Sequence, residues 1–201
     1  GWDSSQGVEM KIKTLSLKHD IYSIEDIFTN HEFSLINDEF TYGRWIFDKK
    51  ESTETSNYPY RGHLETKNSH YGGVDIVGYN NVLNNFAINI KYKIQQLIFD
   101  KPLVLRRINT NIQFFGMESS FHRDNDFSNH WSFVCFVSPD WNSSWGGEFV
   151  VNVKDSEYIH SPYIPNRGVL FPSHFEHMGY SPNRLCNIPR LSIAFVYELL
   201  L

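Results

Sequence analysis

The sequence predicts an α+β protein that is mainly β, with a jelly-roll core in its second half and a supporting helical region in its first. Three observations lead to this fold class. The 201 residues, 41% of them hydrophobic, fit a single domain over 1–201 with a closed core. Apolar residues recur at spacings of three and four within 80–100, which is typical of an amphipathic helix. After Pro102, short extended runs alternate with turn residues, as in antiparallel sandwiches and barrels.

The first half, residues 1–100, contains fewer regular patterns. The apolar stretches 21–24 and 33–36 indicate short helices or edge strands, and 42–47 indicates a strand. Residues 48–78 are polar with scattered glycines, and a loop of this length in a compact domain is either functional or mobile. We therefore expect N-terminal strands, a lid loop and the helix of 80–100 to support a core formed by 101–201.

Six extended runs follow in the second half. Together with strands from the first half they approach the eight strands of a jelly roll. The runs are Leu103–Phe115, Phe121–Asp124, Trp131–Val137, Glu148–Val153, Gly168–Pro172 and Arg190–Leu199.

Charge and composition exclude several classes of partner. Lys and Arg number 18 against 23 Asp and Glu, for a formal net charge of -5, so the basic footprint of a nucleic-acid-binding protein is missing. No apolar run is long enough to cross a membrane. The two cysteines, Cys135 and Cys186, are too few for a disulfide framework. We expect a soluble, cytoplasmic protein, and the sequence carries no signal for an oligomeric state.

The tripeptide His122-Arg123-Asp124 is the first candidate for chemistry. In a strand, residues i and i+2 project from one face, so His122 and Asp124 can converge while Arg123 points away. Such a tripeptide is common by chance, and an exposed strand end with a hydrogen-bonded histidine is the alternative.

A second histidine, His177, follows about fifty residues later, and Arg190 and Ser192 share a face at the start of the last strand. Two imidazoles and one carboxylate on a metal leave positions open, as in non-haem Fe(II) oxygenases. A buried arginine beside a hydroxyl suits one end of a dicarboxylate, because a guanidinium binds a carboxylate through paired charge-assisted hydrogen bonds. The order of these motifs is more specific than any one of them.

At these residues the sequence resembles the Fe(II)- and 2-oxoglutarate-dependent dioxygenases, in particular their prolyl 4-hydroxylase-like branch. The resemblance covers about Leu103 to Leu199. It includes Phe115-Gly116 ahead of His122, a Trp141…Gly146-Gly147-Glu148 turn, and the Pro165-x-x-Gly168-x-x-Phe171 run that leads to His177. The resemblance implies a double-stranded β-helix, the cupin-like form of the jelly roll.

The resemblance also implies a site and a reaction. His122, Asp124 and His177 would bind Fe(II), and Arg190 with Ser192 would anchor 2-oxoglutarate as cosubstrate. With O2, and ascorbate in support, the enzyme would hydroxylate a C–H bond and convert 2-oxoglutarate to succinate and CO2. Halogenating relatives have a small residue at the carboxylate position, so Asp124 favours hydroxylation. The substrate would be a prolyl residue of a protein or peptide, or a free small molecule.

Two departures from the family pattern leave alternatives open. A tyrosine that often contacts 2-oxoglutarate is missing, and Asn111 and Gln113, which share a strand face, could replace it. Phe136 could pack against the methylenes of 2-oxoglutarate or could be an ordinary core residue. The spacing from His177 to Arg190 is longer than in many relatives, so Arg184 competes with Arg190 as the anchor, although it lies in a turn.

Substrate contacts are expected on loops. Tyr58, Tyr60 and Arg61 of the polar loop could close over a substrate, with an ordinary surface loop as the alternative. Arg123 and Asn125 would lie on the rim of the site. His174 is not expected to bind the metal.

The sequence leaves two other functional classes open. A jelly-roll hydrolase or isomerase could use the same three ligands to hold Zn(II), and a binding module could use the fold without catalysis. The pair Arg190 and Ser192 favours the dioxygenase, because a zinc hydrolase has no use for a dicarboxylate anchor.

Overall fold

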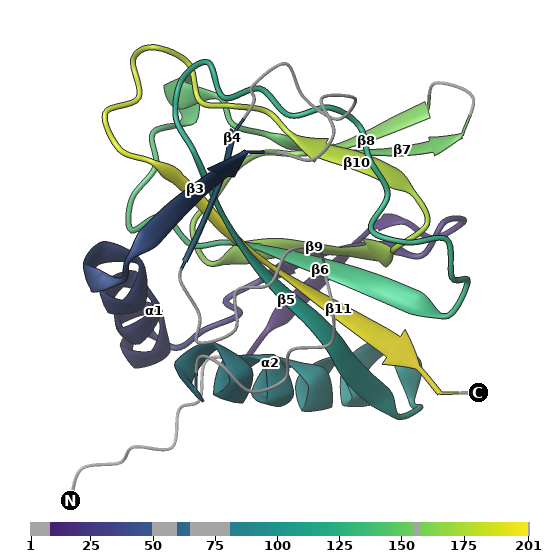
Figure 1. Cartoon of the computed structure of the whole chain (residues 1–201). Helices are drawn as coiled ribbons and strands as arrows, with labels where there is room; N and C mark the ends of the chain where they lie inside the picture. The colour runs from purple at the N-terminus through teal and green to yellow at the C-terminus, as the bar shows by residue number, and fades with distance from the viewer. Residues whose placement is uncertain (1–8, 50–59, 65–80, 155–156, 201) are drawn as a thin grey trace, which may run out of the picture.

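The computed structural model describes residues 9–49, 60–64, 81–154 and 157–200. Within these ranges the chain forms an eight-stranded sheet in the order β1-β2-β9-β6-β11-β5-β4-β3 and a three-stranded sheet in the order β10-β7-β8. The small sheet lies opposite one face of the large sheet, and helices α1 and α2 lie on the other side (Figure 1). The predicted mainly β fold with a jelly-roll core is confirmed. The strands are β1 (Lys11–Ser16), β2 (Ile21–Glu25), β3 (Trp45–Lys49), β4 (Tyr60–Leu64), β5 (Leu103–Gln113), β6 (His130–Phe136), β7 (Phe149–Lys154), β8 (Glu157–Ser161), β9 (Arg167–Pro172), β10 (Glu176–Gly179) and β11 (Arg190–Leu199).

Helix α1 (Asn30–Tyr42) begins at a capping box. The Thr29 side chain accepts a hydrogen bond from the Glu32 backbone N–H, and the Glu32 carboxylate accepts one from the Thr29 N–H. Helix α2 (Asn81–Ile94) continues into a π-helical turn, Gln95–Phe99, so the predicted helix of 80–100 is confirmed. Both helices pack their apolar stripes on the large sheet, where Phe133, Ile193 and Phe195 are fully buried.

The opposite face of the large sheet meets the small sheet and lines the space where the candidate site lies. A second apolar cluster fills part of this space, including Phe136, Phe149, Phe171 and Ala194. Strand β11 shows why both layers are buried: Ile193 and Phe195 face the helices while Ala194, and with it Ser192 and Arg190, faces the small sheet.

Strand β5 alternates in the same way, but its inner row is polar. Ile108 and Ile112 pack in the helix-side cluster, so Arg107, Asn109, Asn111 and Gln113 project from the other face. The strand bulges against β11, where Leu105 pairs with Tyr197 and Arg107 pairs with Val196. The extra residue, Arg106, shifts the alternation by one, so that Leu105 and Ile108 both belong to the helix-side cluster and two consecutive arginines lie between them.

The structure corrects several expectations. The run Phe121–Asp124 is not a strand, since His122 alone forms an isolated bridge, to His177. Residues 60–64, expected within the polar loop, form β4, and Gly62 allows the close approach to β5 because a Cβ there would lie 2.3 Å from Ile112 Cγ2. Of the two alternatives for residues 33–36, the helix is correct, since they belong to α1, but Tyr42 ends this helix rather than starting a strand. Strands β1, β8 and β10 have no counterpart in the prediction. Neither α-helix of the described residues is long and apolar enough to cross a membrane.

Candidate metal and cosubstrate site

Two imidazoles meet at an isolated antiparallel bridge between the 119–125 segment and β10. The His122 N–H donates to the His177 carbonyl at 3.1 Å, and the His177 N–H donates to the His122 carbonyl at 2.9 Å. The ring centroids of the two histidines are 4.5 Å apart. The backbone pairing therefore fixes both side chains side by side, although their sequence positions are 55 residues apart.

Hydrogen bonds to backbone carbonyls orient both rings. The Nδ1 of His122 lies 2.9 Å from the Ser120 carbonyl, and the Nδ1 of His177 lies 3.1 Å from the Phe175 carbonyl. Since a carbonyl only accepts, each Nδ1 is the donor in its hydrogen bond, and Nε2 is the ring nitrogen left for a metal. Burial lowers the pKa of His177 to about 4 despite the opposing attraction of Asp124, so this imidazole is neutral at pH 7, the form that binds metals.

Asp124 brings the carboxylate to the same place. Its backbone N–H donates to the Ser173 carbonyl at 3.2 Å, and its Oδ2 lies 3.7 Å from His177 Nε2. Burial alone would raise the pKa of Asp124, but its polar surroundings, among them the Arg107 guanidinium and the Ser132 hydrogen bond, outweigh burial and hold the pKa below its ordinary value. The carboxylate is therefore ionised at neutral pH.

These three side chains form a donor set. One ligand atom from each of His122, Asp124 and His177 lies within 4.8 Å of the other two. Two imidazole nitrogens and one carboxylate, with their second hydrogen bonds already made, fit the requirements of a non-haem Fe(II) site. The geometry predicted from the tripeptide and the distant histidine is present, even though the tripeptide is not in a strand.

Arg190 lies in the same space between the sheets, and its side chain is held from several sides. Its Nε donates to the Gly147 carbonyl and its Nη1 to Gln113 Oε1, each at 2.8 Å. The guanidinium also lies 4.9 Å from the centroid of the Tyr163 ring. Burial lowers the pKa of Arg190 to about 10, so the side chain is still positively charged at pH 7.

The Nη2 of Arg190 is buried and has no hydrogen-bond partner. Gly179 leaves the space next to it, since a Cβ at this position would lie 2.8 Å from Nη2. A buried cationic donor without an acceptor is costly, and an incoming carboxylate would satisfy it. Arg184, the competing anchor, is exposed in the 180–189 turn.

The other predicted cosubstrate residues lie close to Arg190. Ser192 is buried and pairs with Asn111 of β5 on one side and Phe136 of β6 on the other, so the three form a row across neighbouring strands. Gln113 contacts Arg190 directly, and its Nε2 donates to the carbonyls of Met117 and Gly179. The position of Gln113 therefore suits the orientation of Arg190.

Sequence reasoning missed the residues that hold Asp124 and Arg190. Arg107 and Ser132 contact the Asp124 carboxylate, and Tyr163 lies against Arg190. Arg107 could have been found from the same period-two rule that paired Asn111 with Gln113, because it continues that row. Ser132 and Tyr163 carry no comparable signal.

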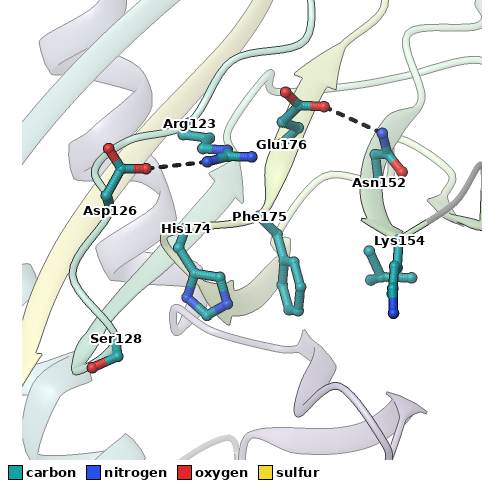
Figure 2. Close-up of a pocket in the computed structure, with 9 residues that line it drawn as sticks. Arg123, Asp126, Ser128, Asn152, Lys154, His174, Phe175 and Glu176 are labelled. Carbon is teal, nitrogen blue, oxygen red and sulfur yellow. Dashed lines mark hydrogen bonds and ion pairs between the residues drawn. The ribbon is translucent and has the colours of Figure 1, made fainter.

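Neither predicted rim residue, Arg123 or Asn125, belongs to the donor set. Arg123 pairs with Asp126 at 3.2 Å. Both line an open groove of about 640 Å³ that also includes His174 and Glu176 (Figure 2). Asn125 accepts the Phe127 N–H within a turn. Tyr58 lies outside the described residues, and Tyr60 and Arg61 are described only through the backbone of β4.

No protein-family model matches the chain, and no curated protein matches it either. Solved structures do match. A prolyl-4-hydroxylase from Pseudomonas putida has 13% identity and a TM-score of 0.60, over 90% of this chain and 93% of that one. A prolyl hydroxylase from Trichoplax adhaerens, in complex with a hypoxia inducible factor peptide fragment, has 13% identity and a TM-score of 0.62, over 90% and 84%.

A third similar structure is HygX from Streptomyces hygroscopicus, with nickel and 2-oxoglutarate bound. It has 10% identity and a TM-score of 0.59, over 90% of this chain and 83% of that one. At these identities the likeness concerns the fold. The chain has the double-stranded β-helix fold of the 2-oxoglutarate- and Fe(II)-dependent oxygenases, as the resemblance in its sequence implied.

Proposed function

We propose that this protein is an Fe(II)- and 2-oxoglutarate-dependent dioxygenase that hydroxylates a C–H bond. The observation that carries the proposal is the pairing of two features in one space between the sheets. One is the converging donor set of His122, Asp124 and His177. The other is Arg190, a buried guanidinium with an unpartnered Nη2. A zinc hydrolase would need the first feature but would have no use for the second.

Each residue has a defined task in this proposal. His122 and His177 would bind through their Nε2 atoms, since each Nδ1 is used in a hydrogen bond to a carbonyl, and Asp124 would bind through a carboxylate oxygen. A bound Fe(II) would supply the redox chemistry that couples decarboxylation of 2-oxoglutarate to hydroxylation of the substrate. Arg190 would bind the distal carboxylate of 2-oxoglutarate and thereby fix the direction in which the rest of this molecule points.

The walls of the space would complete the cosubstrate pocket. Ser192 and Asn111 offer a hydroxyl and an amide beside Arg190, and Phe136 offers an apolar surface to the methylenes. The surrounding apolar cluster would exclude water from the reacting atoms. Gln113, through its contact with Nη1, would keep the Arg190 guanidinium in place.

The substrate is proposed at the level of two classes. Similar folds include one in complex with a peptide fragment and one with hygromycin B bound, so a prolyl residue of a peptide and a small molecule are both candidates. Tyr58, Tyr60, Arg61, Arg123 and Asn125 remain proposed substrate contacts.

The test is the release of succinate from 2-oxoglutarate by purified protein supplied with Fe(II) and ascorbate under air. We expect slow release without substrate, and its loss in Asp124→Ala and His177→Ala. The matched control is His174→Ala, which removes a nearby imidazole outside the donor set and should keep wild-type release. Undiminished release in Asp124→Ala would refute the proposal.

A further inference from the structure

We propose that Arg107 is a positioning residue that holds the Asp124 carboxylate in one orientation, with Oδ2 turned to the metal and Oδ1 turned away from it. The inference rests on the proposed function, since it concerns the metal site of the same reaction. No motif of the sequence assigns a role to Arg107.

Both oxygens of Asp124 are held by residues of the large sheet. Arg107 on β5 donates from Nη2 to Oδ1 at 2.6 Å, and Ser132 on β6 donates from its hydroxyl to Oδ2 at 2.5 Å. The Ser132 hydroxyl proton is used in that bond, so Ser173, 2.8 Å from Ser132, donates to it in turn. Asp124 is therefore held at three points: its backbone N–H donates to the Ser173 carbonyl, and each carboxylate oxygen accepts a hydrogen bond.

The two oxygens differ in what else they face. Oδ2 lies 3.7 Å from His177 Nε2, within the donor set, whereas Oδ1 is taken by the guanidinium. A carboxylate can bind a metal through one oxygen or two. With Oδ1 held by Arg107, Asp124 would act as a ligand through Oδ2 alone, and the remaining metal positions would stay open for 2-oxoglutarate and oxygen.

The surroundings make this pair hard to replace. The Asp124 side chain is 8% exposed and that of Arg107 is 20% exposed, so the two charges compensate each other where water reaches poorly. Removing one partner of such a pair leaves a charge without compensation. Residues that orient metal ligands typically change metal affinity by about 10- to 100-fold when they are lost.

The adjacent residue provides a matched control. Arg106 is the extra residue of the bulge in β5, and its guanidinium bonds Glu198 of β11 instead of Asp124. Its side chain is 44% exposed. The two consecutive arginines thus have the same size and charge, and they differ in whether they touch the candidate metal ligand.

The experiment is a titration of the metal-free protein with Co(II), followed by the visible absorption of the bound ion, in wild type, Arg107→Met, Arg107→Lys and Arg106→Met. We expect Arg107→Met to raise the Co(II) dissociation constant about 10- to 100-fold and to alter the absorption spectrum. Arg107→Lys should fall between wild type and Arg107→Met, and Arg106→Met should match wild type. Thermal unfolding of each variant checks that Arg107→Met folds. A further variant, Ser132→Ala, removes the hydrogen bond to Oδ2 and tests by a smaller change whether the orientation of the Asp124 carboxylate matters.

The outcomes separate the two proposals. If wild type and His177→Ala bind Co(II) equally, the metal site itself is wrong. If His177→Ala loses binding while Arg107→Met and Ser132→Ala keep the wild-type constant within twofold and the same spectrum, the metal site stands and the positioning role of Arg107 is overturned. Equal weakening by Arg106→Met and Arg107→Met would also overturn this role, because it would show a general effect of the strand.

Discussion

Two arginines project into the space between the sheets, and they differ in what their guanidinium groups contact. Arg107 donates a hydrogen bond to the Asp124 carboxylate and balances its negative charge. Arg190 instead contacts neutral acceptors, the Gly147 carbonyl and the Gln113 amide, and keeps a buried Nη2 without a partner.

The difference shows how one interior can hold two cations for two purposes. An arginine with a carboxylate partner inside the protein is compensated and can stiffen that partner. An arginine held by neutral oxygens is positioned without being neutralised, so its charge remains available for an anion from solution. The polar row of β5 contributes to both arrangements, with Arg107 at one end and Gln113 at the other.

The largest effect should come from removing the positive charge of Arg190. Arg190→Met should weaken binding of 2-oxoglutarate to the Mn(II)-loaded protein by about 100-fold or more, because the buried carboxylate would lose its charged partner. Isothermal titration calorimetry measures this affinity. Arg184→Met, which removes an exposed arginine nearby in sequence, should bind as wild type does. Near-normal binding by Arg190→Met would place the dicarboxylate elsewhere.

The next effect should come from making Arg190 resemble Arg107. Gln113→Glu would place a carboxylate at Nη1, which would neutralise the guanidinium and repel the incoming anion. We expect 2-oxoglutarate affinity to fall by about 100-fold. Gln113→Leu, which removes the hydrogen bond and adds no charge, should cost only about tenfold. Equal losses in the two variants would mean that the added negative charge has no effect of its own on anion binding.

Most of the candidate site could be predicted from the sequence, and the residues that were not predicted were missed for a physical reason. His122, Asp124, His177 and Arg190 are found by motif order, since the chemistry requires these residue types. Helix 80–100 is found because its apolar stripe is long. The alternation of β5 could have placed Arg107 on the inner face, but its contact with Asp124 is missed because the two residues are 17 apart and no short motif links them.

The same reasoning explains the structural errors. The tripeptide around His122 has the alternation of a strand, but it pairs with β10 only through the bridge at His177. Strands β8 and β10 are short and carry several polar residues, so their sequences resemble turns. Strand β4 was hidden in a polar stretch because its pairing depends on partners in β3 and β5, and not on its own hydrophobicity.

A smaller effect should follow from filling the space beside Nη2. A Cβ at residue 179 would lie 2.8 Å from Arg190 Nη2 and 3.0 Å from its Cζ, so Gly179→Ala should push the guanidinium aside. We expect an approximately tenfold loss of 2-oxoglutarate affinity and a destabilisation of about 1–3 kcal/mol from overpacking. Calorimetric titration and thermal unfolding measure the two effects. Unchanged affinity would show that the anion approaches Arg190 from another side.

The smallest effect should be that of pH on the affinity for 2-oxoglutarate. It tests whether the Arg190 guanidinium stays protonated over the working range. Burial lowers the pKa of Arg190 to about 10, so about nine in ten guanidinium groups remain protonated at pH 9. Burial raises the pKa of the adjacent Tyr163, against the opposing effect of Arg190, and this phenol stays neutral in the same range. Affinity for 2-oxoglutarate should therefore change by less than about twofold between pH 6.5 and 9.

The matched variant for this prediction is Arg190→Lys. Burial in the same place lowers the pKa of a lysine from a lower starting value, so its charge should be lost within the range in which Arg190 keeps its own. Calorimetric titrations at several pH values should give a falling affinity for Arg190→Lys and a flat one for wild type. A steep fall in wild type would mean that another group titrates against the anion. A flat profile for wild type would support a physical reason for arginine at position 190. A buried cation without a carboxylate partner stays protonated only if its pKa is high enough to remain above neutral pH after burial has lowered it.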